Sequence, residues 1–142
     1  RYDRTGRSTM ILGTGSDILD IRRLEKVFAR YEARFISRHF TAEERARAER
    51  RRAAGTHIAT YAKRFAAKEA VSKALGTGFS HGVYLKDIGV VNDGAGKPSI
   101  KLSGGAQKRL EAITPAGKSS IIHLSMTDEP PYVHAHVIIE AL

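Results

Sequence analysis

The 142-residue sequence predicts an α+β fold in which helices pack on a largely antiparallel sheet. A short apolar run over residues 10–20 is expected to form the first strand. Apolar residues then recur at helical spacing, and the second half consists of short β-rich runs separated by Gly and Pro turns. The expected order of elements is β-α-α-α-β-β-α-β-β.

The first half supplies one strand followed by helices. In the strand MILGTGSDILDI, Gly13 and Gly15 indicate that another group approaches the backbone closely, and a ligand is one candidate. The segment RRLEKVFARYEARFISRHF has apolar residues at helical spacing and predicts two helices with a break near residues 32–33, which count as one element in the order above.

Two further helices follow this segment. Thr41 and Glu44 form a T-x-x-E capping box, which predicts a helix over about residues 42–55. The last long helix is expected over about residues 57–75, and Gly76 is suited to end it.

The second half is expected to form strands around one short helix. DIGVVNDGAGKPSIKLS predicts a hairpin that turns at residues 92–98, and residues 105–113 predict the helix. SSIIHLSMT and YVHAHVIIEAL predict two closing strands, joined by a turn at Pro130–Pro131.

Length and composition predict one domain over residues 10–142, since a chain of this size buries a core without staples. Residues 1–9 are interpreted as a flexible leader or an expression remnant. The sequence has no cysteine, which excludes disulfides and thiolate metal sites and favours a cytoplasmic location. No apolar run approaches the roughly 18–20 residues that span a bilayer, so we expect no membrane partner.

The positive charge is concentrated in one part of the chain. Residues 21–64 contain 13 Lys and Arg against 5 Asp and Glu, so they carry +8 of the formal net charge of +9. Any single arginine there is explained by a solvated helix face. The cluster as a whole favours an anionic partner, such as an acidic protein, a nucleic acid or a phosphorylated small molecule.

Residues 64–73, RFAAKEAVSK, combine small and charged residues on one helix. One arc carries only Ala and Val, which lets the helix lie close to the sheet. The other half carries Arg64, Lys68, Glu69 and Lys73. An exposed Glu69–Lys73 ion pair at i,i+4 is sufficient to explain this spacing.

The alternative is that Glu69 binds a hard divalent cation while the neighbouring cations hold phosphate oxygens. Such a site requires a second carboxylate from elsewhere in the chain. Asp17 is the candidate because it ends the Gly-rich part of the first strand. Asp20 is the competitor, although its position is more typical of an N-cap for the following helix.

Two stretches together identify a family. ILGTGSDILDI and RFAAKEAVSKALGTG closely resemble the paired G-x-D and F-x-x-K-E-A-x-x-K signatures of the 4′-phosphopantetheinyl transferase superfamily. The short length and the closing HLSMTDEPPYVHAHVIIE resemble its bacterial holo-acyl-carrier-protein synthase branch. The resemblance covers nearly the whole chain from Met10 onward and implies the 4′-phosphopantetheinyl transferase fold.

The resemblance implies an activity in fatty acid biosynthesis. Family members move 4′-phosphopantetheine from coenzyme A to a serine of apo-acyl carrier protein and release adenosine 3′,5′-bisphosphate. Asp17 and Glu69 match the two Mg²⁺-binding carboxylates, and Lys73 matches the lysine that meets the pyrophosphate and assists proton transfer. We expect Glu69 or a water on the metal to accept the serine proton. The other expected coenzyme A contacts are Arg64, Lys68, Gly76, Thr77, Gly78 and, at the 3′-phosphate, Arg45.

The same resemblance gives the basic segment a partner. Acyl carrier proteins are strongly acidic, and the family docks them on its first helix. The matching docking residues are Arg22, Arg23, Lys26, Val27, Phe28 and Arg30. Arg50, Arg51 and Arg52 are expected to be solvated. The family also implies a homotrimer, in which one chain gives the two carboxylates and the next closes the pocket.

The chain departs from the family pattern at one position. Many relatives have HVSISH where this sequence has HLSMTD, so Asp128 replaces the second histidine. A contact of that histidine near coenzyme A therefore has no counterpart here. His123 is expected to pack within its strand, and His134 and His136 to be structural.

The sequence disfavours two other interpretations. A small basic nucleic-acid-binding domain would account for the charge, but aromatics are sparse and no such motif is present. It also leaves Asp17 and Glu69 unexplained, so we expect no nucleic-acid partner. Another nucleotide-phosphate enzyme is disfavoured because G-x-x-x-x-G-K-[ST] is absent.

Overall fold

The structure is a computed structural model that describes residues 10–142. The predicted leader, residues 1–9, lies outside the described residues. The elements in order are β1 (Met10–Asp20), α1 (Ile21–His39), α2 (Ala42–Glu49), α3 (His57–Ala74), the 3₁₀ turn η1 (Leu85–Asp87), β2 (Ile88–Asn92), β3 (Pro98–Leu102), α4 (Gly104–Ile113), β4 (Ser120–Glu129) and β5 (Tyr132–Ala141). This is the predicted order of helices and strands, with η1 added before the hairpin.

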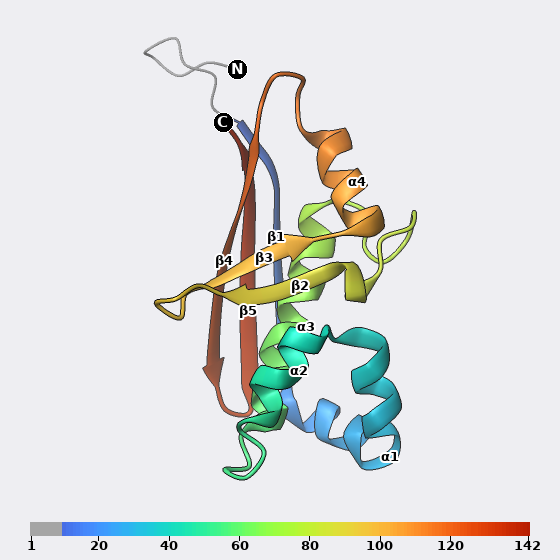
Figure 1. Cartoon of the computed structure of the whole chain (residues 1–142), viewed down its shortest axis with the longest axis vertical. Helices are drawn as coiled ribbons and strands as arrows, with labels where there is room; N and C mark the ends of the chain where they lie inside the picture. Colours follow the sequence, from blue (N-terminus) through green and yellow to red (C-terminus); the bar gives the residue numbers. More distant parts are fainter. Residues whose placement is uncertain (1–9) are drawn as a thin grey trace.

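The strands form two antiparallel sheets. One has the order β1-β5-β4, and β2 pairs with β3 in the other. Helix α3 runs along the long strands, while α1 and α2 lie together at one end and α4 at the other (Figure 1). The small side chains of α3 pack on the alternate residues of β5 that face it, which are Val133, Ala135, Val137, Ile139 and Ala141. The predicted α+β class is confirmed.

An aromatic cluster joins α1, the connection between α1 and α2, and α3. Phe28 and Phe35 of α1 contact each other, and Phe40 lies 4.7 Å from Tyr61 of α3, measured between ring centroids. Phe28 also meets Tyr61 edge-on. Because these aromatic rings bury large apolar areas, they fix how α1 lies on α3.

Most predicted boundaries hold within a residue or two, and the largest difference is at the end of α2. Helix α1 has its kink at Tyr31, where φ is −136°, rather than at residues 32–33. Helix α2 begins at the predicted capping box but ends at Glu49, six residues before the expected end, and turns then lead to Gly55. Gly55 has φ of +75° and therefore suits the end of that turn.

Candidate active site

The site begins with an unusually close contact between β1 and α3. A Cβ atom on Gly13 would lie 1.9 Å from the carbonyl oxygen of Ala74, and one on Gly15 would lie 2.0 Å from that of Ala70. The two backbones therefore touch, which only glycine on the strand allows. The sequence predicted a close approach at these glycines, but α3 makes it rather than a ligand. The contact brings the end of β1 beside the middle of α3.

Two carboxylates and a lysine meet at this contact. Lys73 Nζ donates to the carbonyl oxygen of Ser16 at 2.9 Å and lies 3.2 Å from Asp17 Oδ1. Burial raises the pKa of Glu69, and the Asp17 carboxylate raises it further, while Lys73 opposes them. Glu69 and Asp17 are therefore close enough to repel each other. The lysine is paired with Asp17, whereas an ion pair with Glu69 was the simple expectation.

The carboxylate pair suits a divalent cation. Mg²⁺ is typically bound by one or two protein carboxylates and fills its remaining positions with water and phosphate oxygens. The mutual repulsion of Asp17 and Glu69 is what a cation between them would relieve. Among residues 10–142, no cluster of three or more His, Cys, Asp or Glu side chains forms a fuller metal site. Asp20, the competitor, caps α1 by accepting from the Arg22 amide at 3.0 Å.

Lys68 does not point toward this site. Its ammonium group is fully buried, 2.7 Å from Glu44 Oε1, and donates to the carbonyl oxygens of Ile88 and Leu85. The three contacts use all three ammonium hydrogens. Burial lowers the pKa of Lys68, and the nearby Glu44 carboxylate opposes the shift. The expectation that Lys68 faces coenzyme A phosphates is therefore wrong in this structure.

The side chain of Arg64 lines a basic cavity on another side of α3. The cavity has a volume of about 200 Å³, and its charged lining consists of Arg47, Arg51, Lys63 and Arg64. Arg64 is 3 % exposed, donates to Thr60 and Asn92, and leaves its buried Nε without a partner. Burial lowers the pKa of Arg64 to about 10. A buried guanidinium with a spare donor, beside three further cations, forms a site for an anion.

Arg45, which was predicted to contact the 3′-phosphate of coenzyme A, is not part of this cavity. Arg45 is exposed on α2 and does not line it, because Arg47 and Arg51 are the arginines on the cavity side. Asp128, which replaces the family histidine, lies 3.8 Å from Lys63 at the same end of the molecule. Arg52 is also more than a solvated charge, since it pairs with both Glu32 and Glu49. No periodic pattern in the sequence marked these partners.

The loop after α3 begins at Gly76, the residue that was predicted to end the helix. Gly76 and Gly78 have φ of +79° and +57°, and the Gly78 amide donates to Ser72 at 3.1 Å. Thr77 lies between them, and Arg109 holds the end of α3 through the Leu75 carbonyl oxygen at 2.9 Å. The loop therefore folds back on the last turn of α3, next to Lys73.

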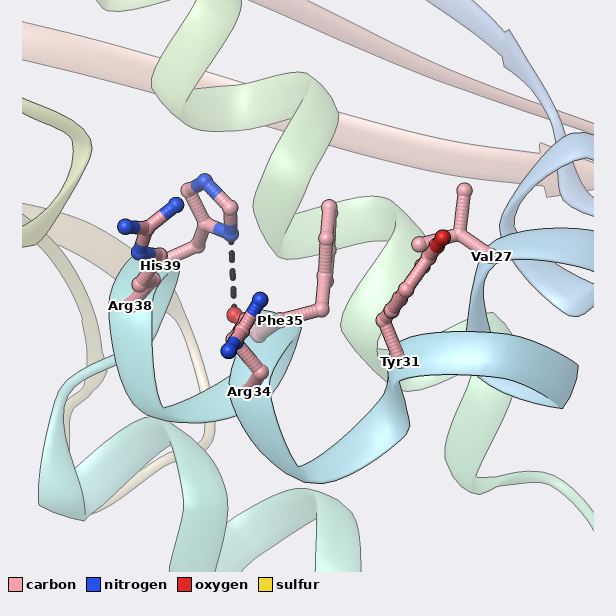
Figure 2. A pocket seen from close by; sticks show the side chains of 6 residues that line it. All are labelled: Val27, Tyr31, Arg34, Phe35, Arg38 and His39. Atoms are coloured by element: carbon pink, nitrogen blue, oxygen red, sulfur yellow. Dashed lines mark hydrogen bonds between the residues drawn. The ribbon is translucent and has the colours of Figure 1, made fainter.

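Helix α1 carries two shallow basic hollows that share Val27 and Tyr31. The first, of about 230 Å³, is also lined by Arg34, Phe35, Arg38 and His39, and Figure 2 shows these side chains around it. The second is lined by Lys26, Ala29 and Arg30 as well. The Nδ1–H group of His39 donates to the Phe35 carbonyl oxygen at 2.8 Å, and burial is the main cause that lowers the pKa of His39.

The predicted docking residues divide on this surface. Lys26, Val27 and Arg30 line the second hollow and Arg23 is exposed nearby on α1, as a docking role requires. Phe28 is 7 % exposed and belongs to the core, so its prediction is wrong in this structure. Arg22 is exposed, but its guanidinium is paired with Asp20 at 2.7 Å.

The histidines of the closing strands do not line the basic cavity at Arg64. His123 is exposed rather than packed, and its Nε2 lies 3.0 Å from Glu140 on β5. His134 and His136 pair across the sheet with Ile18 and Ser16 of β1. None of the helices within residues 10–142 is long and apolar enough to cross a bilayer.

Fold and site together define a small α+β protein with a carboxylate pair suited to a divalent cation and a basic cavity suited to an anion. Comparison with known proteins gives the family. Residues 13–124 match the model of the 4′-phosphopantetheinyl transferase superfamily, and the chain belongs to that superfamily.

Individual relatives agree with this assignment. The chain is 56 % identical over 133 residues to the holo-[acyl-carrier-protein] synthase of Granulibacter bethesdensis, covering 94 % of this chain and 91 % of that protein. The crystal structure of the Neisseria meningitidis synthase is similar with a TM-score of 0.79 and 37 % identity, covering 92 % and 98 % of the two chains. The Bacillus anthracis synthase in complex with CoA (3′,5′-ADP) has a TM-score of 0.71 and 35 % identity, covering 92 % and 97 %.

Proposed function

We propose that this protein transfers 4′-phosphopantetheine from coenzyme A to a serine of an apo-acyl carrier protein in fatty acid biosynthesis. The observation that carries the proposal is the meeting of Asp17, Glu69 and Lys73 where β1 touches α3. Relatives with more than half of their residues identical are holo-[acyl-carrier-protein] synthases. A nucleic-acid-binding role would not explain why two carboxylates and a lysine meet at this point.

In the proposed reaction, the serine Oγ of the carrier protein attacks the phosphorus on the pantetheine side of the pyrophosphate. The bond to the bridging oxygen breaks, and adenosine 3′,5′-bisphosphate leaves with the electron pair. A Mg²⁺ ion held by Asp17 and Glu69 would neutralise charge on the pyrophosphate. Lys73 holds a phosphoryl oxygen, and the Glu69 carboxylate accepts the serine proton.

The cavity at Arg64 is proposed to bind another anionic group of coenzyme A, namely its 3′-phosphate. Arg64 and Lys73 lie nine residues apart, and at about 100° per residue they point to opposite sides of α3. One coenzyme A that contacts both groups would therefore bridge two copies of the chain. For this reason we keep the homotrimer with shared active sites as part of the proposal. The cytoplasmic location is kept because the sequence contains no cysteine.

The two hollows on α1 are proposed to receive the acidic carrier protein. Val27 and Tyr31 form an apolar centre, and the surrounding cations are Arg23, Lys26, Arg30, Arg34 and Arg38. Such charges mainly accelerate encounter and lose their effect as salt is added. The sequence did not predict Arg34 and Arg38 as docking residues. They join the surface because the proposed docking surface continues past the kink at Tyr31 into the second part of α1.

Mass spectrometry of the carrier protein tests the proposal directly. An apo-acyl carrier protein is incubated with coenzyme A, Mg²⁺ and this protein, and the expected product is heavier by one phosphopantetheine. The gain should vanish with a chelator, return with added Mg²⁺, and be absent from a carrier whose acceptor serine is alanine. Failure to modify any bacterial apo-carrier across a range of Mg²⁺ and pH would contradict the proposal.

A further inference from the structure

Beneath the basic cavity lies a buried ion pair whose place in the reaction the sequence does not reveal. Lys68 and Glu44 both have fully buried side chains, with 2.7 Å between Nζ and Oε1. The remaining hydrogen-bonding capacity of the pair is used on backbone groups. Glu44 accepts from the Thr41 amide at 2.8 Å and from the Val90 amide at 3.0 Å. Lys68 donates to the Ile88 and Leu85 carbonyl oxygens.

These contacts join the elements that form the cavity. Glu44 lies three residues before Arg47 on α2, and Lys68 lies four residues after Arg64 on α3. Val90 lies two residues before Asn92, which lines the cavity and accepts from Arg64 at 3.3 Å. The ion pair therefore contacts all three walls of the cavity, which are α2, α3 and β2. In each wall, the contact lies within about one helical turn or one strand repeat of the residue that lines the cavity.

We infer that Lys68 and Glu44 are positioning residues, which set the spacing of Arg47, Arg64 and Asn92 and so the affinity of the cavity for the bisphosphate end of coenzyme A. This inference rests on the proposed function. Lys68 itself meets no ligand, because it is enclosed and its donors are used. The metal carboxylates and Lys73 are held by the β1–α3 contact instead, so the pair acts on binding rather than on the transfer step.

The kinetic test uses Lys68→Met with Leu110→Ala as the matched control. Leu110 is a buried residue of α4 that does not line the cavity. Lys68→Met should raise KM for coenzyme A about tenfold or more while kcat at saturation stays within about threefold, and Leu110→Ala should lower Tm without changing KM. An unchanged KM in folded Lys68→Met, an equal rise in the control, or a fall in kcat alone would overturn the inference.

A binding measurement on the unaltered protein covers the case in which Lys68→Met does not fold. Adenosine 3′,5′-bisphosphate is added without carrier protein, and its binding is followed by calorimetry and by hydrogen exchange. Because the anion stabilises the joined walls, exchange of the Val90 amide should slow, whereas the Leu110 amide should not respond. Binding that leaves Val90 unprotected would contradict the inference. Absence of phosphopantetheine transfer by the unaltered protein would contradict only the proposed function.

Discussion

Lys73 and Lys68 belong to the same short motif on α3, and each is paired with one carboxylate. The Lys73 side chain is 52 % exposed and lies 3.2 Å from Asp17, at the edge of the long sheet. Lys68 is fully enclosed 2.7 Å from Glu44. Exposed pairs contribute little to stability and leave the ammonium group available for a ligand. An enclosed pair tolerates no removal of one partner, because a charge is then left uncompensated in the interior.

The comparison shows that one motif serves two purposes. The half of RFAAKEAVSK that carries Glu69 and Lys73 faces solvent beside β1 and is suited to chemistry. The half that carries Lys68 faces α2 and β2 and is suited to holding the fold together. Substitutions on the two sides should therefore separate the rate of the transfer step from the stability of the fold.

Glu69→Gln should produce the largest change in rate. It removes both a metal ligand and the proposed proton acceptor while keeping nearly the same shape, so kcat should fall by about 10³-fold or more. Because ionised Glu69 is repelled by Asp17, the thermal midpoint should stay the same or rise. Steady-state transfer and a melting curve on the same sample measure both quantities. Full Mg²⁺-dependent activity in this variant would remove Glu69 from the reaction.

Replacing each lysine by methionine tests how much each ion pair contributes to stability. Lys68→Met should lower the free energy of unfolding by about 3–5 kcal/mol, since Glu44 stays buried without its partner. Lys73→Met should lower it by less than about 1 kcal/mol, since that pair is exposed. Urea unfolding under identical conditions gives both values. Equal losses at the two positions would show that the distinction between the lysines is incorrect.

The sequence predicted the order of elements, the capping box and the Asp17–Glu69 pair because these depend on local patterns or on a family motif. It misassigned Lys68 because a helical wheel separates small residues from charged ones but cannot tell solvent from a neighbouring helix. The partner that buries Lys68 is Glu44, whose role in the capping box was evident while its second role was not. Arg47, Lys63 and Asn92 were missed because three separate elements bring them together.

Gly15→Ala tests the contact that supports the exposed side. The added methyl would lie 2.0 Å from the Ala70 carbonyl oxygen, a backbone atom, so β1 or α3 must move. We expect a loss of about 1–3 kcal/mol in stability. Transfer should also slow, because Asp17 moves away from Glu69. Gly94→Ala is the control, since no atom lies within 4 Å of its added Cβ. Equal activity and stability in the two variants would contradict the close contact.

The pH dependence of stability that arises from Glu69 is the smallest expected effect, and it reports on this one carboxyl group. Burial and the Asp17 carboxylate raise the pKa of Glu69 above its ordinary value of 4.5, so the folded protein binds the proton more tightly than the unfolded chain. The stability from protonated Glu69 is therefore fully present below the ordinary value and is lost as pH rises through the raised pKa.

NMR titration of the Glu69 side-chain carboxyl in metal-free protein measures this pKa directly. Asp17→Asn removes the neighbouring charge and should lower the pKa of Glu69 toward its ordinary value, while Lys73→Met removes the opposing cation and should raise it. The two variants shift the same group in opposite directions, which a general loss of structure cannot produce. If both variants moved the pKa of Glu69 in the same direction, the two carboxylates and the lysine would not interact as one electrostatic unit. That result would contradict the proposed active site on the exposed side of α3.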